Sequence, residues 1–271
     1  MSHERRATQA RGRRDLPVAA VVAAWLVLAL VLDVGVGLWP QRALGAATWL
    51  LLLALLRAED RAVRGQVAVV VVLATLVEYT ASPLLGFYVY RLGNVPAFVP
   101  PGHGLVYLAA LALGRSAPFT RYGRPICRSA LLAGGAWALW GVTLAPRGDT
   151  LGLLLYLLFA AFVLTGRAPL VYAGAFLVTG ALELTGTMLG TWAWAPHGPG
   201  GFLAIGNPPS GIAGGYCVFD AAALAVGGWG ATSGIAARPR RRPAVAGRIR
   251  DGRGVQRRAS GVPGRRAVSV E

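Results

Sequence analysis

Residues 66–90 read QVAVVVVLATLVEYTASPLLGFYVY, a run of 25 residues with a single charged side chain, Glu78. An α-helix needs about 20 consecutive apolar residues to cross the hydrocarbon core of a bilayer. This run is long enough to cross, and it carries too little charge for a helix that faces water on one side. The stretch therefore predicts an integral membrane protein built from helices.

Similar apolar stretches recur along the whole chain, which is 55% hydrophobic and 14% charged with a mean hydropathy of +0.54. The fold class we predict is all-α, a polytopic transmembrane helix bundle. The second and fourth stretches are short, so seven spans are the alternative to eight. The eight predicted spans are residues 17–39, 43–56, 66–90, 101–114, 129–145, 150–166, 168–194 and 211–230.

The arginines between the predicted spans fall mainly on one side of the membrane. That side has Arg57, Arg61, Arg64, Arg115, Arg121, Arg124, Arg128 and Arg167, against Arg42, Arg91 and Arg147 on the other. Because positively charged short loops stay in the cytoplasm, eight spans place both termini there. We therefore predict a multi-pass protein of the cell membrane.

The two ends of the chain carry most of the net charge of +16. We predict a basic cytoplasmic N-terminus at residues 1–16, a transmembrane bundle at 17–230 and an Arg-rich disordered cytoplasmic tail at 231–271. The tail has no aromatic residues among its arginines, so we expect it to lie near anionic lipid and not to bind nucleic acid.

Two segments of the chain echo each other. Residues 78–90 read EYTASPLLGFYVY and residues 183–194 read ELTGTMLGTWAW, so both give Glu, Thr, Gly and two aromatics that flank one residue. The sequence GNVP at 93–96 is echoed by GNPP at 206–209. We infer two parallel four-helix repeats, in halves of about 17–114 and 129–230, that meet near an axis along the membrane normal.

Carboxyl groups within apolar spans are the candidate catalytic residues, namely Glu78, Glu183 and Asp220. A charged carboxylate at the bilayer centre costs about 3 kcal/mol, so such groups face the bundle interior and commonly mark a function. Burial favours the neutral form, which donates a proton. A carboxyl that only fixes helix packing is the alternative. Asp33 lies nearer the interface, where we expect a solvated helix end.

Polar and aromatic residues beyond these acids predict a pocket that opens outward. Interfacial aromatic belts and surface histidines are the alternatives. Tyr107 joins the set because it stands 13 residues after Asn94, as Asp220 stands after Asn207. The candidate substrate-binding residues are Tyr88, Tyr90, Asn94, His103, Tyr107, Trp192, Trp194, His197 and Asn207.

The sequence offers none of the motifs that hold nucleotides or metals. It has no Gly-rich phosphate loop, no Asp-rich pair for magnesium diphosphate and no nucleophile elbow with a Ser/His/Asp set. We therefore predict no cofactor and no metal site. The expected partner is a lipid-soluble small molecule.

The Glu, Gly and paired-aromatic pattern resembles integral-membrane carotenoid-biosynthesis proteins of the bisanhydrobacterioruberin hydratase type. The matching residues are Glu78, Gly86, Tyr88 and Tyr90, and again Glu183, Gly186, Gly190, Trp192 and Trp194. The resemblance covers these two short segments, and Trp replaces Tyr in the second. It implies an enzyme of isoprenoid or carotenoid biosynthesis, a lyase or isomerase.

Three functions fit these residues. The first is an enzyme that protonates an isoprenoid alkene or epoxide and directs water or an internal alkene onto the cation, as a hydratase or cyclase does. The second is a small proton-coupled transporter, and the third is a membrane scaffold without catalysis. If the protein is such an enzyme, we expect Glu78 and Glu183 to reach one cavity. We also expect Asp220 to pair with Glu183, so that one acid donates a proton and the other accepts it.

Overall fold

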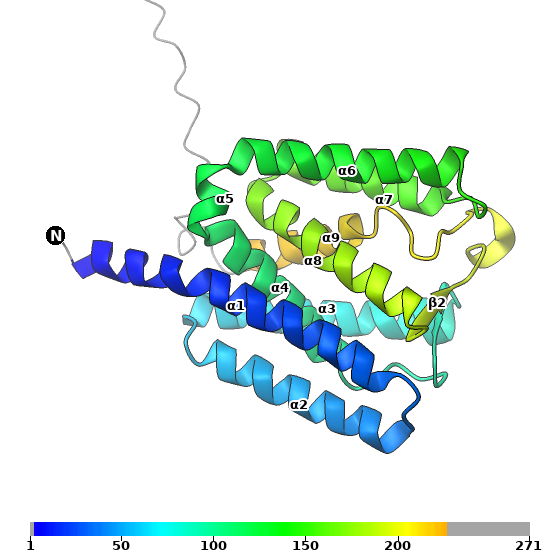
Figure 1. The fold of residues 1–271 in the computed structure, drawn as a ribbon, viewed down its shortest axis with the longest axis horizontal. Helices are drawn as coiled ribbons and strands as arrows, with labels where there is room; N and C mark the ends of the chain where they lie inside the picture. The colour runs from blue at the N-terminus through cyan, green and yellow to red at the C-terminus, as the bar shows by residue number, and fades with distance from the viewer. Residues whose placement is uncertain (1–2, 227–271) are drawn as a thin grey trace, which may run out of the picture. The chain divides into compact units, whose positions relative to one another are not determined.

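The computed structural model describes residues 3–226, with side chains from residue 14 onward. The predicted tail at 231–271 lies outside the described residues. Long helices make up most of the described chain (Figure 1). They are α1 (His3–Asp33), α2 (Leu38–Leu56), α3 (Arg61–Tyr79), α4 (Val99–Arg115), α6 (Gly123–Thr143), α7 (Thr150–Thr165), α8 (Pro169–Met188) and α9 (Ala213–Val226).

These helices overlap the predicted apolar stretches, and the all-α fold class is confirmed. The shorter elements are the π-helix η1 (Thr80–Leu84), α5 (Ala117–Arg121) and the 3₁₀-helix η2 (Pro199–Gly201). Three segments of the described chain are long and apolar enough to cross a membrane: Arg14–Asp33, Arg61–Leu84 and Pro169–Met188. The apolar helices α7 and α9 are shorter.

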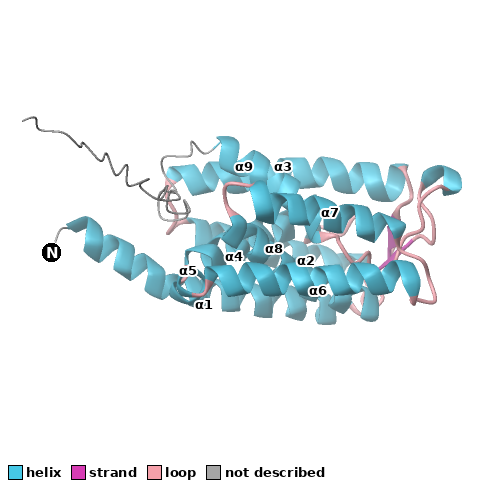
Figure 2. Ribbon diagram, turned by 90° about the horizontal axis from the view of Figure 1, so that it is seen from above, coloured by secondary structure: helices cyan, strands magenta, loops and turns pink. Residues whose placement is uncertain are grey.

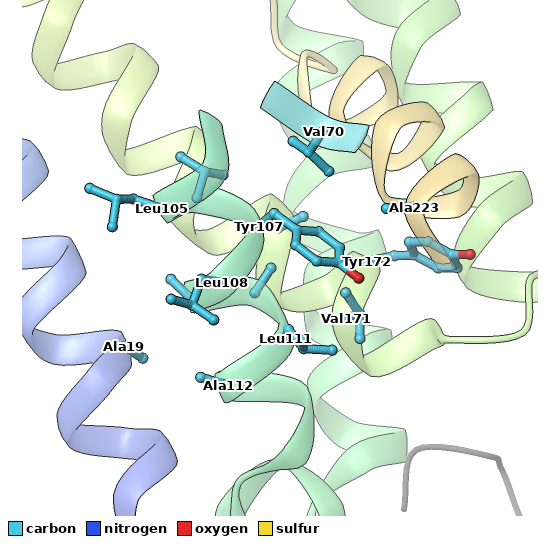
Figure 3. Packing of buried hydrophobic residues seen from close by; sticks show 14 of the residues in the cluster. Ala19, Val70, Leu105, Tyr107, Leu108, Leu111, Ala112, Val171, Tyr172 and Ala223 are labelled. Atoms are coloured by element: carbon cyan, nitrogen blue, oxygen red, sulfur yellow. The ribbon is translucent and has the colours of Figure 1, made fainter. Parts of the chain in front are cut away.

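Helix α4 forms the centre of the core. Its residues 103–112 are buried on every side, because α4 packs against α1, α3 and α8. Figure 3 shows Tyr107 of α4 near Val70 of α3 and Val171 of α8. Small residues allow close approach: a Cβ added at Gly174 would lie 3.0 Å from the carbonyl oxygen of Ala110. Helices α3 and α9 also pack together.

Two predicted spans extend too far, because their last residues form strands. Strand β1 (Tyr88–Tyr90) pairs antiparallel with β2 (Trp192–Trp194), and both lie at the end of the bundle away from the start of α1 (Figure 2). Gly86 and Gly190, at φ +68° and +70°, turn the chain between helix and strand. The predicted ends at residues 90 and 194 are therefore wrong.

The first predicted span is also wrong at its end, since α1 stops at Asp33 and not at residue 39. Gly35 has a φ of +73°, a conformation that only glycine adopts freely, and Gly37 precedes the first turn of α2. The aromatic residue Trp39 consequently belongs to α2.

Candidate functional site

A cavity of about 250 Å³ lies at the strand end of the bundle. Its walls come from α1, α3, η1, α4, α8, α9, the two strands and the adjoining loops, with one residue from α2 and two from α7. Most of the lining side chains are aliphatic or aromatic, and Glu78 and Glu183 are its two acids. The structure therefore brings both predicted glutamates to one cavity.

Glu78 is buried near the end of α3 and holds three polar partners. Its Oε2 accepts hydrogen bonds from the phenols of Tyr88 and Tyr90, each at 2.7 Å. The Nε2 of His103 lies 3.4 Å from Oε1. Burial and the charge of Glu78 raise the pKa of both phenols well above the usual value, so Tyr88 and Tyr90 remain hydrogen-bond donors.

Glu183 has the same arrangement with indoles in place of phenols. Its Oε2 accepts from Nε1 of Trp192 at 3.0 Å and from Nε1 of Trp194 at 3.1 Å. The larger rings need room beneath them, since a Cβ added at Gly186 would lie 2.0 Å from the Trp192 ring. The strand register pairs Tyr88 with Trp194, whose ring centroids are 4.6 Å apart.

Helices α4 and α9 line the cavity with matching positions. In each matched pair the two residues stand 113 positions apart, a spacing that Asn94 and Asn207 also show. His103 and Tyr216 form one such pair, and their rings stack at 5.2 Å with an interplanar angle of 13°. Tyr216 was not predicted from the sequence, although this spacing identifies it. The pairs are Val99 and Ile212, Gly102 and Gly215, His103 and Tyr216, and Val106 and Phe219.

Asp220 and Tyr107 are both buried, and neither is among the residues that line the cavity. The phenol of Tyr107 donates to Oε1 of Gln66 at 3.0 Å. Within the described chain, Oδ2 of Asp220 and Nε2 of Gln66 are buried without a hydrogen-bond partner. The polar partners of Glu183 are thus the two indoles and not Asp220.

Three other predicted residues lie outside the cavity lining and hold loops. Asn94 donates its side-chain amide to Oε1 of Gln41 at 3.0 Å. Asn207 accepts from the backbone N–H of Trp194 at 2.9 Å and so helps to fix β2. His197 is exposed and forms a bridge with Ala204.

The prediction that Asp33 lies at a solvated helix end is wrong, because its side chain is fully buried. Its Oδ1 accepts from Nε2 of Gln41 at 2.9 Å and lies 3.3 Å from Nη2 of Arg91. The same guanidinium donates to the carbonyl oxygens of Asp33 and Val36, and the backbone N–H of Arg91 donates to Thr191. Asp33 therefore anchors the loop that follows β1.

Arg147 and Asp149, which were not predicted from the sequence, hold the end of β2 and the loop that follows it. The guanidinium of Arg147 donates to the carbonyl oxygens of Trp194, Ala195 and Ile205. The carboxylate of Asp149 accepts from the backbone N–H groups of Gly152, Gly206 and Ser210 at 2.7 to 3.0 Å. Arg91 and Arg147, the two arginines near the strands, thus both donate hydrogen bonds to backbone carbonyls.

The site combines two acids with a wall of aromatic rings, and His103 is the only basic side chain among its lining residues in the described chain. Such a site can move protons and stabilise positive charge through ring faces. Comparison with family models, curated proteins and solved structures found no match to this chain.

Proposed function

We propose that the chain is a multi-pass protein of the cell membrane with eight spans in two parallel four-helix repeats and both termini in the cytoplasm. The equivalent contacts of α3 with α9 and of α8 with α4 support the repeat. So does the antiparallel register of the strands, which places Val89 opposite Ala193 at the centre of the pair. A twofold axis through this point would exchange the two glutamates and their donors.

We further propose that the cavity is the active site of an enzyme that protonates an isoprenoid alkene or epoxide. The observation that carries this proposal is the pair of buried glutamates on one aromatic cavity. A carboxylic acid would give its proton to the alkene carbon, which leaves a tertiary cation facing the rings. Water or an internal alkene then attacks the cation, and a carboxylate takes up the released proton.

The cavity volume limits how much of a substrate can enter. A cavity of about 150 Å³ holds benzene, and this one measures about 250 Å³. It therefore suits the end of an isoprenoid chain, while the remainder of a long substrate would lie in the bilayer. This agrees with the isoprenoid substrate that the resemblance to carotenoid-biosynthesis proteins implies.

Lipid extracts of a deletion strain and its parent, compared by mass spectrometry, identify the substrate and product. Purified Glu78→Gln and Glu183→Gln variants should then convert that substrate at least about a hundredfold more slowly, the size expected for a lost general acid or base. Glu59→Gln is the matched control, because Glu59 contacts Arg115 and does not line the cavity. Folded Glu→Gln variants with unchanged turnover would exclude this enzyme.

A second candidate, a proton-coupled transporter, is favoured by the interruption of α3. The helix changes to the π-helical segment η1, with Pro83 inside it, directly after Glu78 and Tyr79. Discontinuous helices at an acidic site are typical of transporters. Substrate flux into proteoliposomes that follows a pH step and is lost in Glu183→Gln, without chemical conversion of the substrate, would select this function.

A further inference from the structure

We propose that the cavity binds a lipophilic organic cation, specifically a tertiary or quaternary ammonium group on an apolar body of about ten carbons. This goes beyond the proposed reaction, because the ligand is a stable cation and needs no chemistry. The same site would bind it as a mimic of the carbocation or as the cargo of a carrier.

The charge of the cavity wall is the first argument. Glu78 and Glu183 are both buried, and His103 is the one basic group of the described residues that faces them. Nearby Arg91 and Arg147 donate to backbone carbonyls and do not line the cavity. Buried carboxylates are stable only when a cation or a proton compensates them. The wall therefore favours a positively charged ligand.

The hydrogen-bond donors of the wall are the second argument. The phenols of Tyr88 and Tyr90 and the indoles of Trp192 and Trp194 all donate to the two glutamates. An anion or a sugar, which needs donors from the wall, would have to break these bonds. A quaternary ammonium group needs no donor and is attracted by ring faces, as in aromatic cages for choline and methyl-lysine.

The size of the cavity selects the shape of the cation. Benzyltrimethylammonium adds a small charged group to one phenyl ring, and its size suits about 250 Å³ when about 150 Å³ holds benzene. Tetraphenylphosphonium carries four phenyl rings and exceeds this volume. Neopentylbenzene has the shape of benzyltrimethylammonium without its charge, so the two compounds form a matched pair.

Proton linkage follows from the groups that surround each acid. Glu78 faces His103 of α4 and the phenols of β1, while Glu183 faces the indoles of β2, and Tyr216 of α9 lines the same cavity. A bound cation favours the carboxylates over the neutral acids. Binding should therefore release protons, and the affinity should rise with pH.

The test uses the purified full-length chain in lipid nanodiscs, with empty nanodiscs as the background. We expect calorimetric titration to show benzyltrimethylammonium binding at least about tenfold more tightly than neopentylbenzene, and tetraphenylphosphonium not binding. Glu78→Gln and Glu183→Gln should each weaken the ammonium by about tenfold or more, as loss of a buried charge partner does. Glu59→Gln should bind like the parent.

Equal affinity for the charged and neutral probes, or full affinity in both folded Glu→Gln variants, would overturn the inference. If those variants do not fold, Tyr216→Leu keeps both acids and removes the ring stacked on His103, and it must reduce the preference for the ammonium. Cation binding without turnover of any lipid would support this inference and contradict the proposed enzyme. Turnover without cation binding would support the proposed enzyme and contradict this inference.

Discussion

The two halves of the site hold their glutamates with the same geometry but different chemistry. Glu78 accepts from two phenols and lies beside His103, whereas Glu183 accepts from two indoles, and Tyr216 takes the place of the histidine. A phenol or an imidazole can pass a proton onward, but an indole N–H can only donate a hydrogen bond. The donors to Glu78 are therefore groups that can also exchange protons, whereas the donors to Glu183 are fixed.

The largest effect should come from removing both donors of one glutamate. Trp192→Phe with Trp194→Phe removes two hydrogen bonds to a buried carboxyl and also leaves empty volume, so we expect a loss of about 3 kcal/mol or more in unfolding free energy. Tyr88→Phe with Tyr90→Phe removes only the two hydroxyls and should cost less. Thermal melting in nanodiscs measures both. If the double Tyr→Phe substitution lowered stability more than the double Trp→Phe substitution, the Glu78 half would contribute more to the stability of the fold.

Gly186→Ala should have the next largest effect. The added Cβ would overlap the Trp192 ring at 2.0 Å, and overpacking of this kind costs about 1 to 3 kcal/mol. Ala81 stands three residues after Glu78, as Gly186 stands after Glu183, so the half with smaller rings already accommodates a methyl group at this position.

Ala81→Gly is the matched change in the other half, and it should cost no more than about 1 kcal/mol because it only loosens the backbone. Melting temperatures of the two variants compare the halves directly. A Gly186→Ala protein as stable as its parent would mean that Trp192 does not need this glycine beneath its ring.

The helices and the two buried glutamates could be predicted from the sequence. A long apolar run is expected to form a buried or membrane-spanning helix, and a single acid within it is expected to face the interior of the bundle. The strands were missed since the apolar run continued into YVY and WAW, although their alternation of exposed and buried residues has the period of a strand. Gly86 and Gly190 were the signals for the turns.

The shape of the cavity could not be predicted, because it depends on how the outer helices pack. Helix α1 contacts α4 and α8 and contributes Trp25, Leu26 and Leu30 to the cavity. Its counterpart α6 contacts α7 and α8 and contributes none of the lining residues in the described chain. A repeat in the sequence predicts equivalent helices, but it does not fix where each one docks.

A moderate effect is expected at high pH, and the two phenols that donate to Glu78 should contribute to it. Burial and the Glu78 charge raise the pKa of Tyr88 and Tyr90, so the folded protein keeps two protons that the unfolded chain loses near pH 10. Their contribution to stability is complete below pH 10 and decreases as the pH rises above it. Tyr88→Phe with Tyr90→Phe should flatten this decrease in melting temperature between pH 10 and 12. An unchanged slope would mean that the phenols are not the groups responsible.

The smallest effect should come from Tyr107 and Asp220, which occupy matching positions of α4 and α9. Tyr107→Phe leaves Oε1 of Gln66 without its donor and should cost about 1 kcal/mol of unfolding free energy. Asp220→Asn removes a buried acid whose Oδ2 has no hydrogen-bond partner in the described chain, so stability should stay the same or rise slightly.

Turnover of the lipid substrate and ammonium affinity should both change less than about threefold in Asp220→Asn, since Asp220 does not line the cavity. The melting temperature, turnover rate and ammonium affinity of this one variant distinguish two possible pairs of reacting acids. If Asp220→Asn lost activity as severely as Glu183→Gln while folding normally, the reacting pair would be Glu183 with Asp220, as the sequence suggested. Unchanged activity would leave Glu78 and Glu183, joined through the strand pair, as the acids that act together.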